Sequence, residues 1–284
     1  MILRLFLLCS SWSLSAVSTM AQTPYPVPTG KTELTASFSF QTYDQFFDSS
    51  RSVSLSAFGI KQIDQYSANL YAEHGLSEDV TLDLMLGWTW ATMNTPLVAG
   101  QPAEIDGLND TVLGLRWRFL DEQKTPSLPT LALRVGGTLG GSYESGFINS
   151  PGKGASGAEY GLLLGKYYEA CRTGIYSSLL HKLFDGSAPD QLHFGLGIYY
   201  LVSDRISIFA NYRRIESLSG VDFDSPAFNL GRFRELREKS DNLEYGVGYT
   251  DAMGRNYGLT LYHVLDGSNS AKKFGLNASV SIPF

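Results

Sequence analysis

Cysteine is nearly absent from the sequence, and so are long apolar runs. Cys9 and Cys171 are the two cysteines among 284 residues, and Cys9 lies in an N-terminal segment that has the pattern of a secretory signal. Removal of that segment leaves Cys171 alone, which excludes an intrachain disulfide and a zinc or redox site built from cysteines. The rest of the chain has no run of about eighteen apolar residues, which excludes a membrane-spanning helix.

Charge is scarce, and positive charge is the scarcer of the two signs. Charged residues make up 18% of the chain, with 22 Lys and Arg against 28 Asp and Glu, for a net charge of −6. Nucleic-acid-binding domains carry a basic face, so this balance argues against nucleic acid as a partner. The four histidines are scattered, and with one cysteine they predict no metal site and no cofactor.

The N-terminus has the features of an exported chain. Residues 1–21 combine the positive charge of Arg4, an apolar run, and small residues before a cut after Ala21, which predicts a signal peptide. Residues 22–31 are rich in proline and predict an extended periplasmic leader. Export without a spanning helix leaves two destinations, namely the soluble periplasm or the outer membrane as a β-barrel.

Alternation of apolar and polar residues is the dominant pattern of residues 32–284. In the last twelve residues, from Lys273 to Phe284, every second residue is apolar, which predicts a strand with one apolar and one polar face. The pattern recurs roughly twelve times, and the connections mostly alternate between long and short. We therefore predict an all-β fold: a transmembrane antiparallel β-barrel of about twelve strands in the outer membrane of a Gram-negative bacterium, with both termini periplasmic.

One observation supports this prediction, and another leaves part of it open. Aromatic residues of the apolar faces gather near both ends of the predicted strands, as in the aromatic girdles of membrane barrels, whereas a soluble periplasmic β-sandwich has no need of two such bands. The facing of the sixth and seventh strands, which join near 169–172, stays ambiguous because Leu162, Leu163 and Leu164 interrupt the alternation, as do Leu179 and Leu180.

Two segments resemble one family of outer-membrane proteins. The stretch from Gly107 to Phe119 reads GLNDTVLGLRWRF, and the turn from His74 to Leu82 reads HGLSEDVTL. Both resemble segments of the outer-membrane transporters of the phenol meta-degradation pathway type. The resemblance implies a barrel of this size that passes small, hydrophobic or aromatic molecules.

The function we expect is passive uptake of small molecules through an outer-membrane channel. The alternative is a structural or adhesive barrel that transports nothing. A further alternative, an outer-membrane lipid hydrolase, needs a serine beside a histidine, and none of the four histidines begins a His-x-Ser sequence. We therefore expect no enzymatic activity.

Charged residues on the predicted lumen face gather near the short turns. By the alternation, the following residues point inward on strands two to five: Glu73, Asp83, Arg116, Arg118 and Arg134. One interpretation is a constriction that selects solutes by charge. The other is an ion-pair network that neutralises itself and closes the lumen.

The predicted outer loops contain large apolar side chains, which are unusual on a wet surface. They are Phe46, Phe47, Leu97, Val98, Phe223, Phe228, Leu230 and Phe233. These residues predict either an extracellular capture site for an apolar substrate or loops that pack against one another.

The remaining expected partners belong to the outer membrane itself. Phe284, with Ile282 and Val280 at the alternate positions, resembles the C-terminal signal read by the barrel-assembly machinery. The apolar strand faces predict contact with outer-membrane lipid. Basic residues of the longest loop could contact lipopolysaccharide phosphates, but acidic residues of the same loop balance their charge. We expect a monomer. The last strand should pair with the first, so that no free strand edge remains.

Overall fold

The computed structural model describes residues 23–48, 51–96 and 100–284. The predicted signal peptide and the loop residues Leu97 and Val98 lie outside the described residues. Within them, no helix has both the length and the apolar character needed to cross a membrane.

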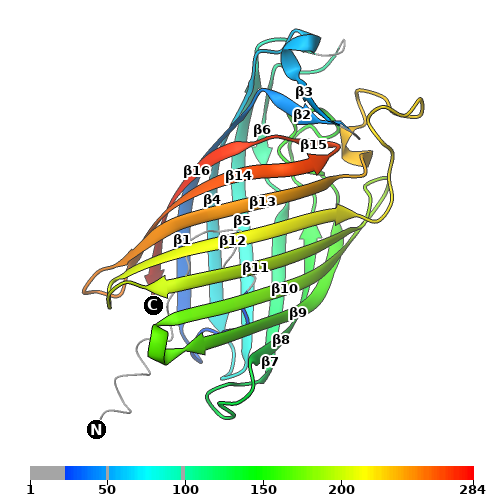
Figure 1. Ribbon diagram of the computed structural model, residues 1–284. Helices are drawn as coiled ribbons and strands as arrows, with labels where there is room; N and C mark the ends of the chain where they lie inside the picture. The colour runs from blue at the N-terminus through cyan, green and yellow to red at the C-terminus, as the bar shows by residue number, and fades with distance from the viewer. Residues whose placement is uncertain (1–22, 49–50, 97–99) are drawn as a thin grey trace.

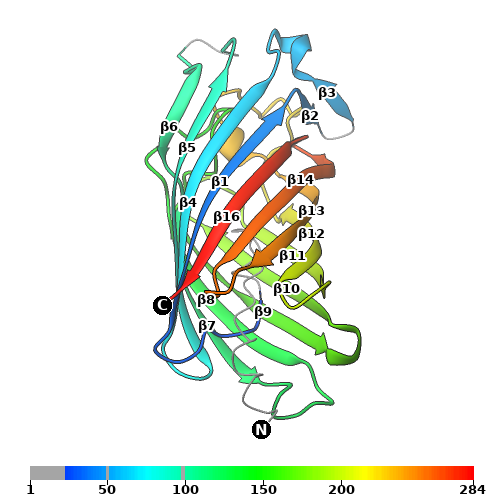
Figure 2. The same cartoon turned by 90° about the vertical axis from the view of Figure 1, so that its left-hand side faces the viewer.

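Twelve long antiparallel strands of the described chain close into a barrel (Figures 1 and 2). In chain order they are β1 (Thr32–Tyr43), β4 (Ile63–Gly75), β5 (Val80–Met93), β7 (Thr111–Leu120), β8 (Thr130–Leu139), β9 (Gly157–Tyr168), β10 (Thr173–Phe184), β11 (Gln191–Leu201), β12 (Ile206–Ser217), β13 (Lys239–Thr250), β14 (Asn256–Ser268) and β16 (Phe274–Pro283). Each pairs with the next one along the chain, and β1 pairs with β16 over ten residues. The predicted barrel is confirmed.

The wall of the barrel has an apolar outer face and a polar inner face. On β16, Phe274 and Leu276 are exposed on the outside, whereas Ser279 and Ser281 are buried inside. Aromatic pairs occur on the outer face near the strand ends, for example Trp88 with Trp90, Trp117 with Phe119, and Tyr249 with Tyr257. An apolar outer surface bordered by aromatic rings suits a bilayer, and the polar faces are left to line the lumen.

The structure settles the facing of β9 and β10. Leu163 and Leu180 point inward and pack with Ala132, whereas Leu162, Leu164 and Leu179 are exposed on the outer face. The leucine runs obscured the alternation because one member of each run faces the lumen. An apolar spot therefore interrupts the polar lining on this side of the barrel.

The two ends of the barrel differ. At the end that we call the short-turn end, the hairpins are joined by the turns 76–79, 121–129, 169–172, 202–205 and 251–255. Phe284 lies at this end too, where its backbone exchanges hydrogen bonds with Thr32. The opposite, long-loop end holds the connections 44–62, 94–103, 140–156, 185–190, 218–238 and 269–273.

Short strands and 3-10 turns lie at both ends of the barrel. At the long-loop end, β2 (Gln45–Phe47), β3 (Ser52–Ser54) and β15 (Ser270–Ala271) form a small sheet, with the 3-10 turns η2 (Leu55–Phe58) and η4 (Phe233–Glu235). The turn η3 (Glu169–Cys171) joins β9 to β10. The strand β6 (Glu104–Leu108) pairs with the half of β5 nearer the long-loop end and leads into β7, which pairs with the other half.

Candidate functional site

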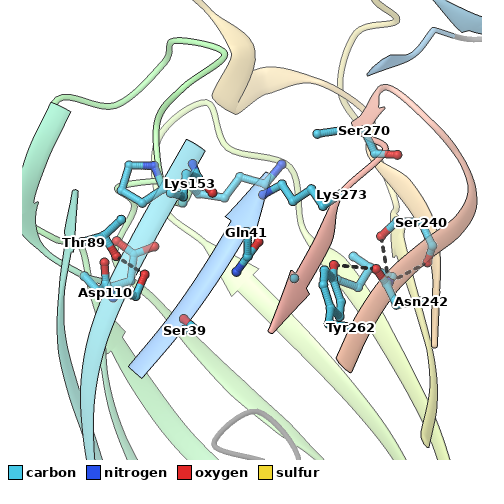
Figure 3. Close-up of a pocket in the computed structure, with 18 of the residues that line it drawn as sticks. Ser39, Gln41, Thr89, Asp110, Lys153, Ser240, Asn242, Tyr262, Ser270 and Lys273 are labelled. Atoms are coloured by element: carbon cyan, nitrogen blue, oxygen red, sulfur yellow. Dashed lines mark hydrogen bonds between the residues drawn. The ribbon is translucent and has the colours of Figure 1, made fainter. Parts of the chain in front are cut away.

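A cavity of about 600 Å³ occupies the lumen of the barrel. Its wall combines side chains from the polar faces of the strands, such as Ser39, Gln41 and Asn242, with side chains from the loops of the long-loop end (Figure 3). Asp83, Arg134 and Glu159 line it toward the short-turn end. We call these three residues, together with Glu73 and Arg116, the ion-pair layer.

Arg134 is the centre of the ion-pair layer. Its two terminal nitrogens donate to both carboxylate oxygens of Asp83 at 2.6 and 2.9 Å, and its Nε donates to Glu159 at 2.6 Å. The side chains of Arg134 and Asp83 are each 1% exposed. A two-pronged arginine–carboxylate contact away from water is among the stronger polar interactions in proteins.

A second pair completes the layer beside the first. Arg116 donates to Glu73 at 2.7 Å, and both side chains are buried. The buried side chain of Tyr71 lines the same cavity. Lys182 lies 3.2 Å from Glu159, so the three carboxylates are matched by three cations. This geometry favours the self-neutralising interpretation of the predicted patch.

Arg118 does not join the ion-pair layer, although the alternation places it on the same face. It lies at the rim, where it contacts Asp79 at 2.8 Å and Asp121 at 3.3 Å, both in short turns. Conversely, Glu159 was missed because it lies on β9, whose facing the leucines obscured. The structure therefore brings together four of the five predicted lumen residues.

The leader crosses the lumen at the short-turn end. The carbonyl oxygen of Thr23 accepts a hydrogen bond from Arg116 at 3.0 Å, and the amide of Val27 donates to Thr81 Oγ1 at 3.0 Å. Figure 2 shows this blue start of the described chain running across the lower end of the barrel before β1 begins. The leader thus lies beneath the ion-pair layer.

On the far side of the lumen, Tyr25 anchors the leader. Its hydroxyl donates to Glu122 at 3.1 Å, and burial together with nearby Tyr199 and Glu122 raises its pKa, so that it stays a donor. A Cβ on Gly165 would lie 2.7 Å from the Pro24 ring, so glycine is required for this close approach. The leader therefore contacts β5, β7, the turn 121–129 and β9.

The segment 140–156, which we call the in-folded loop, contributes to the cavity wall at the long-loop end. Asp110 accepts hydrogen bonds from the backbone of Gly141 and from the hydroxyl of Tyr143, both at 2.8 Å. Burial and Asp110 raise the pKa of Tyr143, which stays protonated. Further along, Asn149 is fully buried, and its backbone carbonyl oxygen accepts a hydrogen bond from the side chain of Gln65 on β4.

We expect Asp110→Ala to loosen the in-folded loop. The change leaves the buried hydroxyl of Tyr143 and the amide of Gly141 without their acceptor, a loss of about 1 to 3 kcal/mol. Limited chymotrypsin digestion should then cut at Tyr143 or Phe147 at least about tenfold faster than in the unmodified protein. Asp106→Ala, on the exposed part of β6, is the control. Equal cutting in the two variants would contradict this role of Asp110.

Four of the predicted capture residues form one aromatic cluster at the long-loop end. Phe223 lies 5.2 Å from Phe46, 5.1 Å from Phe228 and 6.0 Å from Phe233, measured between ring centres. Phe47 is buried elsewhere, with the ammonium of Lys272 over its ring. The loops pack against one another, and Phe46 and Phe233 also line the cavity.

Three of the four histidines have neutral hydrogen-bond partners. His74 pairs with Thr32, His181 with Tyr160, and His193 with Gln191. None of these is the serine–histidine pair that nucleophilic hydrolysis uses.

Comparison with known proteins gives structural likeness without sequence likeness. No protein-family model matches the chain, and no curated protein matches it. An outer-membrane channel from Pseudomonas putida F1 has a similar structure, with a TM-score of 0.71 at 15% identity over 91% of this chain and 97% of that one. The translocator domain of the autotransporter NalP from Neisseria meningitidis scores 0.51 at 15% identity, over 91% of this chain and 90% of that one.

A deletion mutant of TodX, a monoaromatic hydrocarbon channel, scores 0.50 at 10% identity over 95% of this chain and 94% of that one. At such identities the likeness establishes the fold. That fold is shared by channels and by an autotransporter domain, so function must be argued from the lumen.

Proposed function

We propose that this protein is an outer-membrane channel for the passive uptake of small molecules. The observation that carries the proposal is the cavity of about 600 Å³ inside a closed barrel, which a structural or adhesive barrel has no need to keep. Its size lies in the range of small-molecule sites. The channel named among the similar structures supports the same function.

In this proposal the long-loop end faces the outside and both termini lie in the periplasm. A solute enters past the aromatic cluster into the cavity and leaves at the short-turn end, where the leader and the ion-pair layer form the gate. The apolar wall near Phe46 and Phe233 suits hydrophobic or aromatic groups, as the resemblance to the phenol meta-degradation type implies. The C-terminal residues Val280, Ile282 and Phe284 serve recognition by the barrel-assembly machinery.

Uptake by cells tests the proposal. A strain that lacks the gene should take up small radiolabelled solutes more slowly than the same strain complemented with it, for at least one of a panel of neutral aromatic, fatty and ionic compounds. Uptake should persist after the proton gradient is collapsed, because diffusion needs no energy source. Equal uptake of every solute by both strains would favour the structural or adhesive alternative.

A further inference from the structure

Lys273 differs from the other basic residues that line the cavity. Lys182 and Arg213 lie within 3.3 Å of a glutamate oxygen, Lys153 lies 3.4 Å from one, and Arg234 donates to the hydroxyl of Ser187. Among the described residues, the ammonium of Lys273 has neither a carboxylate oxygen within the 4.0 Å ion-pair distance, which Arg234 also lacks, nor a hydrogen-bond partner such as Arg234 has in Ser187. Its ammonium lies 5.5 Å from the centre of the Tyr43 ring.

One carboxylate serves the two ammonium groups of Lys273 and Lys153. Glu238 lies 3.4 Å from Lys153, and among the described residues no carboxylate oxygen lies within 4.0 Å of Lys273. Figure 3 shows the two lysines reaching from opposite sides toward the middle of the cavity, above Gln41. Two cations served by one carboxylate leave an excess positive charge in a partly enclosed space, which attracts an anion.

An apolar surface adjoins this charge. Tyr43, Ile148 and Leu236 line the cavity together with Phe46 and Phe233 of the aromatic cluster. The Tyr43 hydroxyl donates to the carbonyl oxygen of Ile148 at 2.7 Å, which fixes the ring beneath Lys273. A charged point and an apolar wall thus meet at Tyr43, and polar groups such as Asn242 and Tyr262 line the cavity from the nearby strands β13 and β14.

We propose that this part of the cavity binds small amphipathic carboxylates, such as an aromatic monocarboxylate. The carboxylate lies between Lys273 and Lys153, and the ring lies against Tyr43 and the aromatic cluster. The inference rests on the proposed channel function and gives that channel a substrate class. A simple inorganic anion makes no use of the apolar wall, and an uncharged hydrocarbon makes no use of the lysines.

Titration calorimetry on the purified full chain tests the proposal, with 4-ethylbenzoate as the probe. The uncharged 4-ethylbenzyl alcohol and the ringless acetate should each bind at least about tenfold more weakly, since each lacks one half of the contact. Lys273→Met should weaken binding of 4-ethylbenzoate about tenfold and leave binding of the alcohol unchanged. Lys272→Met is the matched control, because Lys272 contacts Gln45 and does not line the cavity.

Three results would overturn the proposal: equal affinity for the acid and the alcohol, equal affinity for the acid and acetate, or equal effects of Lys273→Met and Lys272→Met. Lys153→Met provides a second variant if Lys273→Met fails to fold. Failure here is separable from failure of the channel function. A channel without this site still passes neutral solutes into cells, whereas a binding site without a channel gives calorimetric binding and no uptake.

Discussion

Deletion of residues 23–29 is expected to raise the rate of arabinose entry into liposomes by at least about tenfold. Three hydrogen bonds, from Arg116, Val27 and Tyr25, hold the leader across the short-turn end. Each contributes about 1 kcal/mol net, and ordering of the segment offsets part of the sum. A remaining preference of about 1.4 kcal/mol for the closed state corresponds to that tenfold change.

The deletion keeps residues 1–22, so the predicted signal and its cut site stay intact. Liposome swelling measures the rate, and the tetrasaccharide stachyose is the size control, because the polar lumen still limits large solutes. Replacement of residues 23–29 by a glycine–serine segment of equal length separates loss of the contacts from loss of the chain. Unchanged swelling of the deletion variant would mean that the leader does not close the lumen.

Arg134→Met is expected to destabilise the barrel by roughly 3 to 5 kcal/mol, because Asp83 then remains buried without a cation and Glu159 keeps only Lys182. Loss of tryptophan fluorescence during urea unfolding in liposomes measures the change. The additional substitution Asp83→Asn should recover part of the loss, since it removes the unpaired charge.

Arg118→Met is the matched control for this experiment. Arg118 pairs with Asp79 and Asp121 at the rim, where its side chain is 13% exposed and that of Asp79 is 36% exposed. Its carboxylate partners can still be hydrated after the change, so the replacement of Arg118 should cost less than that of Arg134, about 1 to 2 kcal/mol. Equal destabilisation by Arg118→Met and Arg134→Met would show that the ion-pair layer is no more important than a rim pair.

The barrel could be predicted from the sequence because each strand must place apolar residues toward lipid and polar residues toward the lumen. Alternation is a local property, so it can be read without knowing which strands pair. It failed at β9 and β10, where Leu163 and Leu180 pack in the lumen with Ala132. An inward apolar contact removes the contrast between the two faces on which the prediction depends.

The candidate site was predicted only in part, because ion pairing depends on height along the barrel as well as on facing. Arg118 and Arg116 share a face but lie two positions apart, which separates a rim contact from a buried one. The path of the leader could not be predicted, because a proline-rich segment has no periodicity to show what it contacts. Lys273 lay on the predicted polar face, but its lack of a carboxylate partner becomes visible only when the loops are in place.

A reversible lock on the leader tests the central claim most directly. In a chain with Cys171→Ser, the substitutions Val27→Cys and Thr81→Cys place two thiols where the amide of residue 27 now meets the Thr81 hydroxyl. In planar bilayers we predict that the oxidised protein shows no opening events, and that a reductant restores the openings of the unlocked chain. Equal conductance before and after reduction would contradict a channel gated by its leader.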